Sequence, residues 1–384
     1  MIQSPSSSKI AAAFVAASMC LLPACASSPD DDAEDNADNE QAQTTQSELR
    51  RQPPPLQGPV GQWTWIDVPE SKCGNGEPTG LMVNMGTGRD LLIFLGGGGA
   101  CWNELSCTVL KTASNIDGYK EAQFRAQGAY ADSGIFDRTA SDNPFRKASF
   151  VYVPYCTGDI HAGDATQQFP TAGRTMHYAG QKNIAAFLDK IVPSFPKASH
   201  VTLAGSSAGG FGAQVNYWRV KQAFGNRQVD LINDSGPVFS QVNMPLYPLW
   251  KATWNMEPAL PPGCTACKTD IRSIYSYYSQ TYPFSRFALL SYEQDPTISF
   301  FFQMPQSSFT EHLRDVTTNT IAPLHNTRFF VTSGAGHTML RALGTTSVTK
   351  SIHPWHSQAT SIELGTWLNQ MVDDSWRWQN ATTQ

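Results

Sequence analysis

The chain has 384 residues, of which 41% are hydrophobic, and a formal net charge of −5 at pH 7. Of its 32 acidic and 27 basic residues, eight acids lie between positions 30 and 48; with these, Lys9, Arg50 and Arg51 set aside, 24 of each sign remain. This balance gives no electrostatic basis for binding nucleic acid or a strongly anionic polymer, while the length allows one large domain.

The first 25 residues have the features of an export signal. Lys9 supplies a positive charge, and residues 10–22 form an apolar stretch that is too short to span a membrane. Residues 22–25, Leu-Pro-Ala-Cys, resemble a bacterial lipoprotein box, which predicts that Cys25 is acylated and becomes the mature N-terminus. The alternative is ordinary signal cleavage at the small residues 24–26. We therefore expect a protein anchored by lipid at the outer membrane or cell surface, or a secreted one.

Residues 26–57 predict a disordered tether. The segment is acidic, contains three consecutive prolines at 53–55 and has almost no apolar side chains, so it cannot bury a core of its own. The catalytic domain is expected over residues 58–384. We expect it to be a monomer that contacts the membrane only through the N-terminal lipid.

Strand-like and helix-like runs alternate along the predicted domain. Apolar runs predict strands at 63–68, 81–85, 91–95, 150–155, 200–204, 229–233, 287–292 and 328–332, and intervening helices include 179–191 and 208–224. This alternation predicts an α/β fold with a mostly parallel sheet and helices on both faces. Aromatic and proline-rich segments interrupt it at 103–147, 239–286 and 299–324, and insertions of this kind commonly build substrate clefts.

Four glycines, residues 96–99, follow the third predicted strand. A backbone without Cβ atoms can approach a substrate closely and turn its N–H groups toward it. Such groups stabilise the oxyanion that forms during ester hydrolysis. A phosphate-binding loop is the alternative, but no Gly-Lys-Ser/Thr follows the run. The run therefore predicts part of an oxyanion hole.

Residues 205–209 read Gly-Ser-Ser-Ala-Gly and fit the Gly-x-Ser-x-Gly motif of a nucleophile elbow. The motif lies between a predicted buried strand and a predicted helix, which is the setting that it requires. It predicts Ser207 as the nucleophile and the N–H group of Ala208 as one oxyanion donor. A glycine-rich loop without chemistry is the alternative.

The general base and its acid are expected after the nucleophile, in the order Ser, Asp or Glu, His. His337 follows the last long predicted strand, whereas the other seven histidines lie before the nucleophile, before that strand or beyond its loop. Asp295 follows the preceding strand and is the predicted acid, which would hold the imidazole in the correct tautomer. Asp234 comes only 27 residues after Ser207 and is the reserve candidate, with a supporting hydrogen-bond role preferred for it.

Six cysteines remain once Cys20 and Cys25 are assigned to the export signal. An even number in an exported chain predicts disulfides. Local pairing of Cys101 with Cys107 and of Cys264 with Cys267 would leave Cys73 for Cys156. The first of these would brace the loop after the glycine run. A zinc site is the alternative, although the spacings fit no common zinc motif.

An ordered set of motifs resembles the pectin acetylesterase family, which includes the Notum-type carboxylesterases. The motifs are Gly-Gly-Gly-Gly-Ala-Cys-Trp at 96–102, Pro-Tyr-Cys-Thr-Gly-Asp at 154–159, Gly-Ser-Ser-Ala-Gly-Gly at 205–210, Asp-Ser-Gly at 234–236, Gln-Asp at 294–295 and Gly-His at 336–337. The resemblance covers about residues 60–372. It implies an α/β-hydrolase fold and hydrolysis of an O-acyl ester without a cofactor.

The resemblance also implies roles for single residues. The family's nucleophile, acid and histidine fall on Ser207, Asp295 and His337, and its oxyanion donors on Gly98, Gly99 and Ala208. Its disulfides agree with the pairs Cys73–Cys156 and Cys101–Cys107. One departure is that Gly99 and Ala100 stand where Notum-like members carry an aromatic residue. That departure concerns the shape of the acyl pocket.

The expected activity is removal of acyl groups, acetyl above all, from a polysaccharide such as pectin. One alternative is a lipase, polyester hydrolase, peptidase or lipid deacylase on the same fold. Another is a surface carbohydrate-binding protein without catalysis.

Two further groups of residues have two interpretations each. Asp159, His161 and Asp164 could ligate a metal ion, but no spacing is diagnostic, and a polar loop lining the cleft is preferred. The side chains of Trp102, Trp250 and Trp254 could stack on sugars or could simply be buried.

Overall fold

The computed structural model describes residues 55–345, 348–351 and 360–383. The predicted export signal, Cys25 and all but the last three residues of the predicted tether lie outside these ranges. Within them, no helix is long and apolar enough to cross a membrane.

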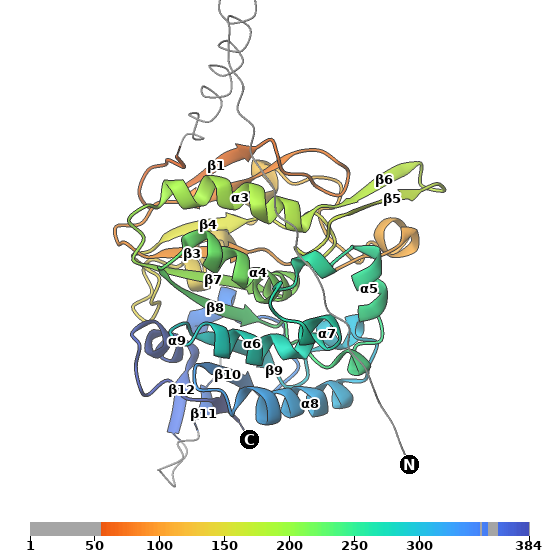
Figure 1. The fold of residues 1–384 in the computed structure, drawn as a ribbon. Helices are drawn as coiled ribbons and strands as arrows, with labels where there is room; N and C mark the ends of the chain where they lie inside the picture. Colours follow the sequence, from red (N-terminus) through yellow and green to blue (C-terminus); the bar gives the residue numbers. More distant parts are fainter. Residues whose placement is uncertain (1–54, 346–347, 352–359, 384) are drawn as a thin grey trace, which may run out of the picture. The chain divides into compact units, whose positions relative to one another are not determined.

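The described strands build one large sheet, in the order β1-β2-β4-β3-β7-β8-β9-β10-β13-β11-β12 (Figure 1). Every neighbouring pair from β4 to β13 is parallel, whereas β1, β2, β11 and β12 pair antiparallel at the two edges. The strands are β1 (Trp63–Val68), β2 (Thr79–Asn84), β3 (Leu91–Leu95), β4 (Ser149–Val153), β7 (His200–Ser206), β8 (Gln228–Asp234), β9 (Phe287–Tyr292), β10 (Thr327–Thr332), β11 (Val348–Ser351), β12 (Thr360–Glu363) and β13 (Ala381–Thr382). The predicted α/β architecture is confirmed.

Helices cover both faces of this sheet, and Figure 1 shows α3, α4 and α6 in front of it. The helices are α2 (Glu121–Arg125), α3 (Gly180–Ser194), α4 (Ala208–Phe224), α5 (Tyr247–Thr253), α6 (Ile274–Thr281), α7 (Pro296–Phe301), α8 (Gln306–Asp315) and α9 (Leu364–Val372). Side chains of α3, α4, α6 and α8 share one apolar core, and those of α2 and α9 share a second.

Strand β3 shows why the central strands are apolar throughout. All five of its residues are buried; Leu91, Ile93 and Leu95 enter the first core, while Leu92 and Phe94 enter the second. A strand covered on both faces needs apolar side chains at every position, because successive residues point to opposite faces.

The three expected disulfides form, joining Cys73 with Cys156, Cys101 with Cys107 and Cys264 with Cys267. A separate two-stranded hairpin, β5 (Ala165–Phe169) and β6 (Arg174–Tyr178), was not among the predicted strands. Its outward residues are polar, so the sequence carries no apolar run that marks it.

Candidate active site

Ser207 lies in the sharp turn between β7 and α4. Its backbone has φ = 60° and ψ = −124°, a strained conformation for a residue with a side chain. The flanking glycines are required by close backbone contacts: a Cβ on Gly205 would lie 2.1 Å from the Gly209 carbonyl oxygen, and a Cβ on Gly209 would lie 2.0 Å from that of Leu95. The backbone of residues 205–209 therefore has the sharp turn that the motif predicts.

The glycine loop after β3 borders the same space as Ser207. Gly98 and Gly99 have φ angles of 153° and 74°. Both glycines and Ser207 line one cavity. Ala208 is the first residue of α4, where a backbone N–H group has no acceptor within its own helix.

His161 contacts the backbone at the start of this glycine loop. Its Nε2 lies 2.8 Å from the Gly96 carbonyl oxygen, and its ring packs on Tyr155 with 4.8 Å between ring centroids. Burial lowers the pKa of His161 to about 4, so the neutral ring donates its Nε2–H to the carbonyl at neutral pH. The interpretation of residues 159–164 as a polar loop lining the cleft is wrong for Asp159 and His161, because both are buried.

The carboxylate of Asp159 is occupied by donors from its own loop and from α3. It accepts hydrogen bonds from the Thr157 hydroxyl and from the backbone N–H groups of Gly163 and Gly180. Asp164 instead pairs with Lys182. Throughout the described ranges, no three His, Cys, Asp or Glu side chains gather in a way that could hold a metal ion.

Asp295 and His337 are joined directly. His337 Nδ1 lies 2.7 Å from Asp295 Oδ2. The other carboxylate oxygen, Oδ1, accepts the backbone N–H groups of Thr297 and Ile298 at 3.0 Å each and so caps α7. Asp295 is fully buried, whereas the His337 side chain is 22% exposed and lines the cavity that contains Ser207. The helix cap fixes the carboxylate, and the carboxylate in turn orients the imidazole.

Asp234 occupies a different position from the one that a triad acid needs. Its Oδ2 accepts the Ser206 hydroxyl at 2.7 Å and the N–H groups of Met339 and Leu340 at 3.0 Å each. Its carbonyl oxygen accepts the Ser207 N–H at 2.7 Å. Burial raises the pKa of this carboxyl, and the hydrogen bonds that it accepts oppose the shift. Asp234 therefore ties the loop that carries His337 to the turn that carries Ser207.

Two hollows meet at Ser207. An open cleft of about 500 Å³ contains polar side chains, and a small recess of about 20 Å³ is apolar. Side chains that line the cleft include Asn115, Tyr119, Gln123, Gln127, Tyr152, His337 and Arg341. The recess is lined by Gly99, Ala100, Ile160, Ser207, Ala208, Phe211, Trp250, Ile298, Phe301 and Phe302.

Most of the cleft side chains were not singled out from the sequence. Tyr119, Gln123 and Gln127 belong to the insertion 103–147, so the only signal was that insertions build clefts. Of the three tryptophans considered as sugar platforms, Trp250 and Trp254 are buried, and Trp102 is partly buried and packs against Trp250. Burial is therefore the correct interpretation for Trp250 and Trp254.

The arrangement of strands and helices is that of the α/β hydrolases. Residues 62–260 match the sequence profile of the pectinacetylesterase family, and the chain belongs to that family.

Curated relatives include the palmitoleoyl-protein carboxylesterases NOTUM of Mus musculus and Homo sapiens. The mouse protein is 28% identical over 182 residues, 43% of this chain and 33% of that protein; the human protein is 27% identical over 167 residues, 39% and 30% respectively. The chain thus spans about a third of the length of these relatives. A solved structure of the Wnt deacylase Notum from Drosophila superposes with a TM-score of 0.58 at 16% identity, covering 83% of this chain and 96% of that one. This similarity supports the fold alone.

Proposed function

We propose that the protein is a serine esterase that removes O-acetyl groups from a polysaccharide such as pectin. Ser207 is the nucleophile, His337 the general base and acid, and Asp295 the residue that orients His337. The backbone N–H groups of Gly98, Gly99 and Ala208 form the oxyanion hole. The hydrogen bond from His337 to Asp295 and the shared cavity of Ser207 and His337 support these roles.

The reaction proceeds through an acyl-enzyme. Ser207 Oγ bonds to the carbonyl carbon while its proton passes to His337, and the carbonyl oxygen becomes an oxyanion. The bond to the alcohol oxygen then breaks, and that oxygen takes the proton from His337. A water molecule, deprotonated by His337, attacks the acyl-enzyme in the same way. The acid leaves and Ser207 regains its proton.

The small apolar recess is the observation that favours acetyl as the acyl group of the substrate. Its volume of about 20 Å³ is close to the space that a single water molecule needs. It accommodates the methyl group of an acetyl ester, whereas a long acyl chain would have to displace aromatic side chains. Trp250 lines the recess and packs against Trp254, with 5.4 Å between stacked rings.

The open cleft suits the alcohol side of the substrate. Asn115, Gln123 and Gln127 supply amide groups, while the Tyr119 ring is buried and its hydroxyl accepts a hydrogen bond from Gln127. Amide groups match the hydroxyls of a sugar, because each amide can both donate and accept hydrogen bonds. These features favour a glycan leaving group.

Export is supported by the three disulfides, which persist in oxidising compartments outside the cytosol. Acylation of Cys25 and retention at a bacterial cell envelope remain proposals. Metabolic labelling with a palmitate analogue tests them: wild-type protein should take up label and a Cys25→Ala variant should not. Equal labelling of the two would overturn the anchor.

Acetate release from O-acetylated polygalacturonate tests the proposed activity. The full chain should release acetate, and a Ser207→Ala variant should release none above background. A Ser206→Ala variant serves as the matched control, since it changes the neighbouring hydroxyl and should retain most of the activity. Folded wild-type protein without turnover on any ester would instead favour a carbohydrate-binding protein.

A further inference from the structure

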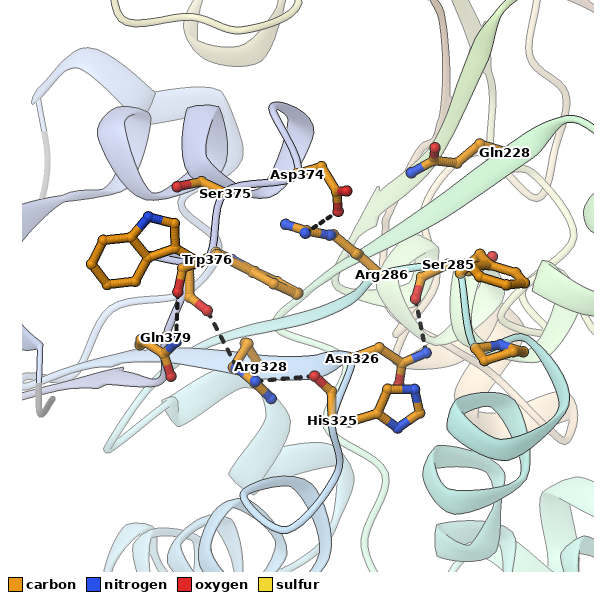
Figure 2. Close-up of a pocket in the computed structure, with 13 residues that line it drawn as sticks. Gln228, Ser285, Arg286, His325, Asn326, Arg328, Asp374, Ser375, Trp376 and Gln379 are labelled. Atoms are coloured by element: carbon orange, nitrogen blue, oxygen red, sulfur yellow. Dashed lines mark hydrogen bonds and ion pairs between the residues drawn. The ribbon is translucent and has the colours of Figure 1, made fainter. Parts of the chain in front are cut away.

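Another cavity lies away from the cleft and the recess, at the opposite ends of the strands from Ser207. Its residues lie at the amino ends of β8, β9 and β10 and in the turn after α9, whereas Asp295 and His337 follow the carboxyl ends of β9 and β10. The cavity has a volume of about 370 Å³, within the range of small-ligand sites (Figure 2). Strands β9 and β10 have six residues each and rise about 20 Å, so this cavity and the proposed active site are separated by about that distance.

Two exposed aromatic residues flank this cavity. Phe284 is 90% exposed and Trp376 is 72% exposed, and the two come from loops far apart in the sequence. Exposed aromatic side chains beside a hollow mark a binding surface more often than isolated ones do. The buried Trp378 also lines the cavity, and its Nε1 has no hydrogen-bond partner among the described residues.

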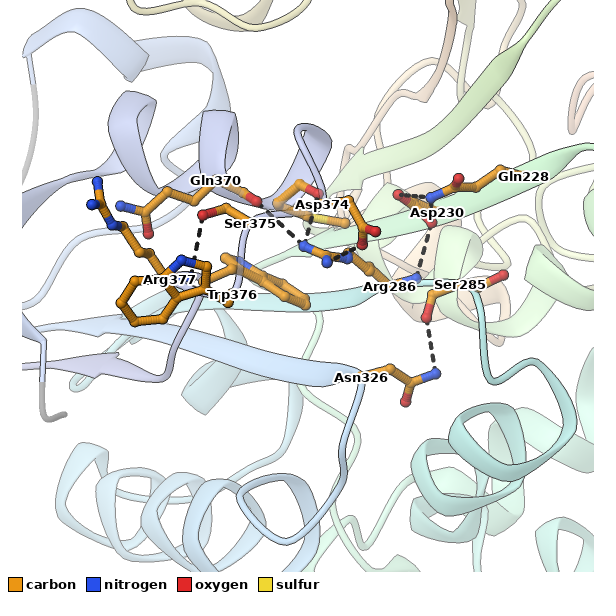
Figure 3. A network of polar contacts seen from close by, with 12 residues as sticks. Gln228, Asp230, Ser285, Arg286, Asn326, Gln370, Asp374, Ser375, Trp376 and Arg377 are labelled. Carbon is orange, nitrogen blue, oxygen red and sulfur yellow. Dashed lines mark hydrogen bonds and ion pairs between the residues drawn. The ribbon is translucent and has the colours of Figure 1, made fainter. Parts of the chain in front are cut away.

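The charge of the lining is positive. Arg286 forms an ion pair with Asp374 and donates to backbone carbonyls of α9, as Figure 3 shows. Arg328 donates to the carbonyls of Leu324, Thr327 and His325, and in the described chain no carboxylate pairs with it. Two guanidinium groups thus line the cavity against a single carboxylate.

Both guanidinium groups lie beside the same tryptophan ring. Arg286 and Arg328 approach the Trp378 ring, at 5.3 and 5.8 Å from its centroid. Burial and the charge of Arg286 both lower the pKa of Arg328, which means that the two cations repel each other. The buried Asp230 accepts the backbone N–H of Arg286 at 2.9 Å and lies beside His200 Nε2 at 2.8 Å, but it does not line the cavity. An anion inside the cavity would reduce the repulsion between the two guanidinium groups.

We propose that this cavity binds an acidic sugar unit, a uronate, of the polysaccharide whose acetyl groups are cleaved at Ser207. The proposal rests on the proposed function. The carboxylate of the sugar faces Arg286 and Arg328, and the sugar ring packs against Phe284 and Trp376. Such a site holds the polymer to the enzyme and raises the local concentration of ester groups at the cleft.

Calorimetric titration of the full chain with Ser207→Ala tests the proposal. The probes are a short oligogalacturonate and an uncharged galacto-oligosaccharide of the same length. We expect the acidic oligomer to bind at least tenfold more tightly, and the added changes Phe284→Ala and Trp376→Ala to weaken it at least tenfold. A Val242→Ala variant, equally exposed at another place, should bind like the parent. Equal binding of the two oligomers, or no loss in the aromatic variants, would overturn the proposal.

Phe284→Ala alone keeps the test decisive if loss of Trp376 destabilises the fold, because the Phe284 side chain is almost wholly exposed. With Ser207 intact, the aromatic variants should hydrolyse p-nitrophenyl acetate at the wild-type rate and show a raised KM for the polymer with kcat unchanged. Absence of ester hydrolysis by the wild type would refute the proposed activity, while the titration would still decide the binding site.

Discussion

On one side of Ser207 lies a polar cleft of about 500 Å³ that is open to solvent, and on the other lies an apolar recess of about 20 Å³. The cleft takes Tyr119, Gln123 and Gln127 from the insertion 103–147. The recess takes Trp250 and Phe301 from the two later insertions. The proposed reacting groups, by contrast, follow the carboxyl ends of sheet strands. In this proposal the sheet positions the groups that react, and the insertions determine which ester fits.

The largest effect is expected from a change at Asp295, whose carboxylate orients His337. Asp295→Asn should lower kcat about 10⁴-fold with KM little changed, because the imidazole loses its fixed tautomer. Steady-state kinetics on p-nitrophenyl acetate measure this. Asp234→Asn is the matched control, and a larger loss there than at Asp295 would reverse the assignment of the acid.

The small volume of the recess leads to a second prediction, about acyl length. Phe301→Ala removes a ring that lines the recess, so kcat/KM for butyryl and hexanoyl esters should rise about 10- to 100-fold relative to acetyl. Phe300→Ala is the control, since the neighbouring ring is exposed and does not line the recess. An unchanged profile in Phe301→Ala would mean that the acyl group binds elsewhere.

A smaller effect is expected at Asp234, which hydrogen-bonds to Ser206 and to the segment after His337 but lines neither hollow. Asp234→Asn should lower kcat about tenfold and leave KM unchanged, because both hollows keep their linings while Ser207 and His337 lose their common anchor. Ser206→Ala removes one of these hydrogen bonds and should cost less. A variant that loses only thermal stability, with kcat per folded molecule intact, would limit Asp234 to a structural role.

The last effect concerns the pH dependence of stability rather than catalysis, and it involves His161, which contacts the glycine loop. Unfolded His161 takes up a proton below its usual pKa near 6.5, whereas the folded protein resists protonation down to about pH 4. The unfolded state therefore binds more protons between these values, so stability falls as the pH falls, by at most about 3 kcal/mol. Urea unfolding at pH 7 and pH 4.5 measures the loss. His161→Gln, which keeps a donor for Gly96, should lose less, and an identical loss would assign the effect to other groups.

The strands of the sheet and the candidate residues of the active site could be located in the sequence because their signals are local. Strand β3 and helix α4 begin and end at the predicted residues, since an unbroken apolar run and a proline-free stretch fix their limits. Ser207 is marked by its glycines, and His337 by its place after a strand. The link from His337 to Asp295 rather than Asp234 followed from chain order, and the structure contains that hydrogen bond.

The remaining features depend on contacts between distant segments. Short strands β11, β12 and β13 have no apolar run of their own and exist through pairing at the sheet edge. The partners of Asp234 lie more than 100 residues away at Met339 and Leu340, and sequence spacing does not reveal them. The recess likewise requires Trp250 and Phe301 to meet beside Ser207, which only the packed insertions bring about.

The most direct measurement is kcat/KM of the full chain for p-nitrophenyl esters from acetyl to palmitoyl, with Ser207→Ala alongside. We expect the highest value for acetyl, a steep fall once the acyl chain exceeds a few carbons, and no turnover without the Ser207 hydroxyl. A maximum at long chains would contradict it, because a recess of about 20 Å³ could not be the acyl site, and the protein would then be a lipid deacylase.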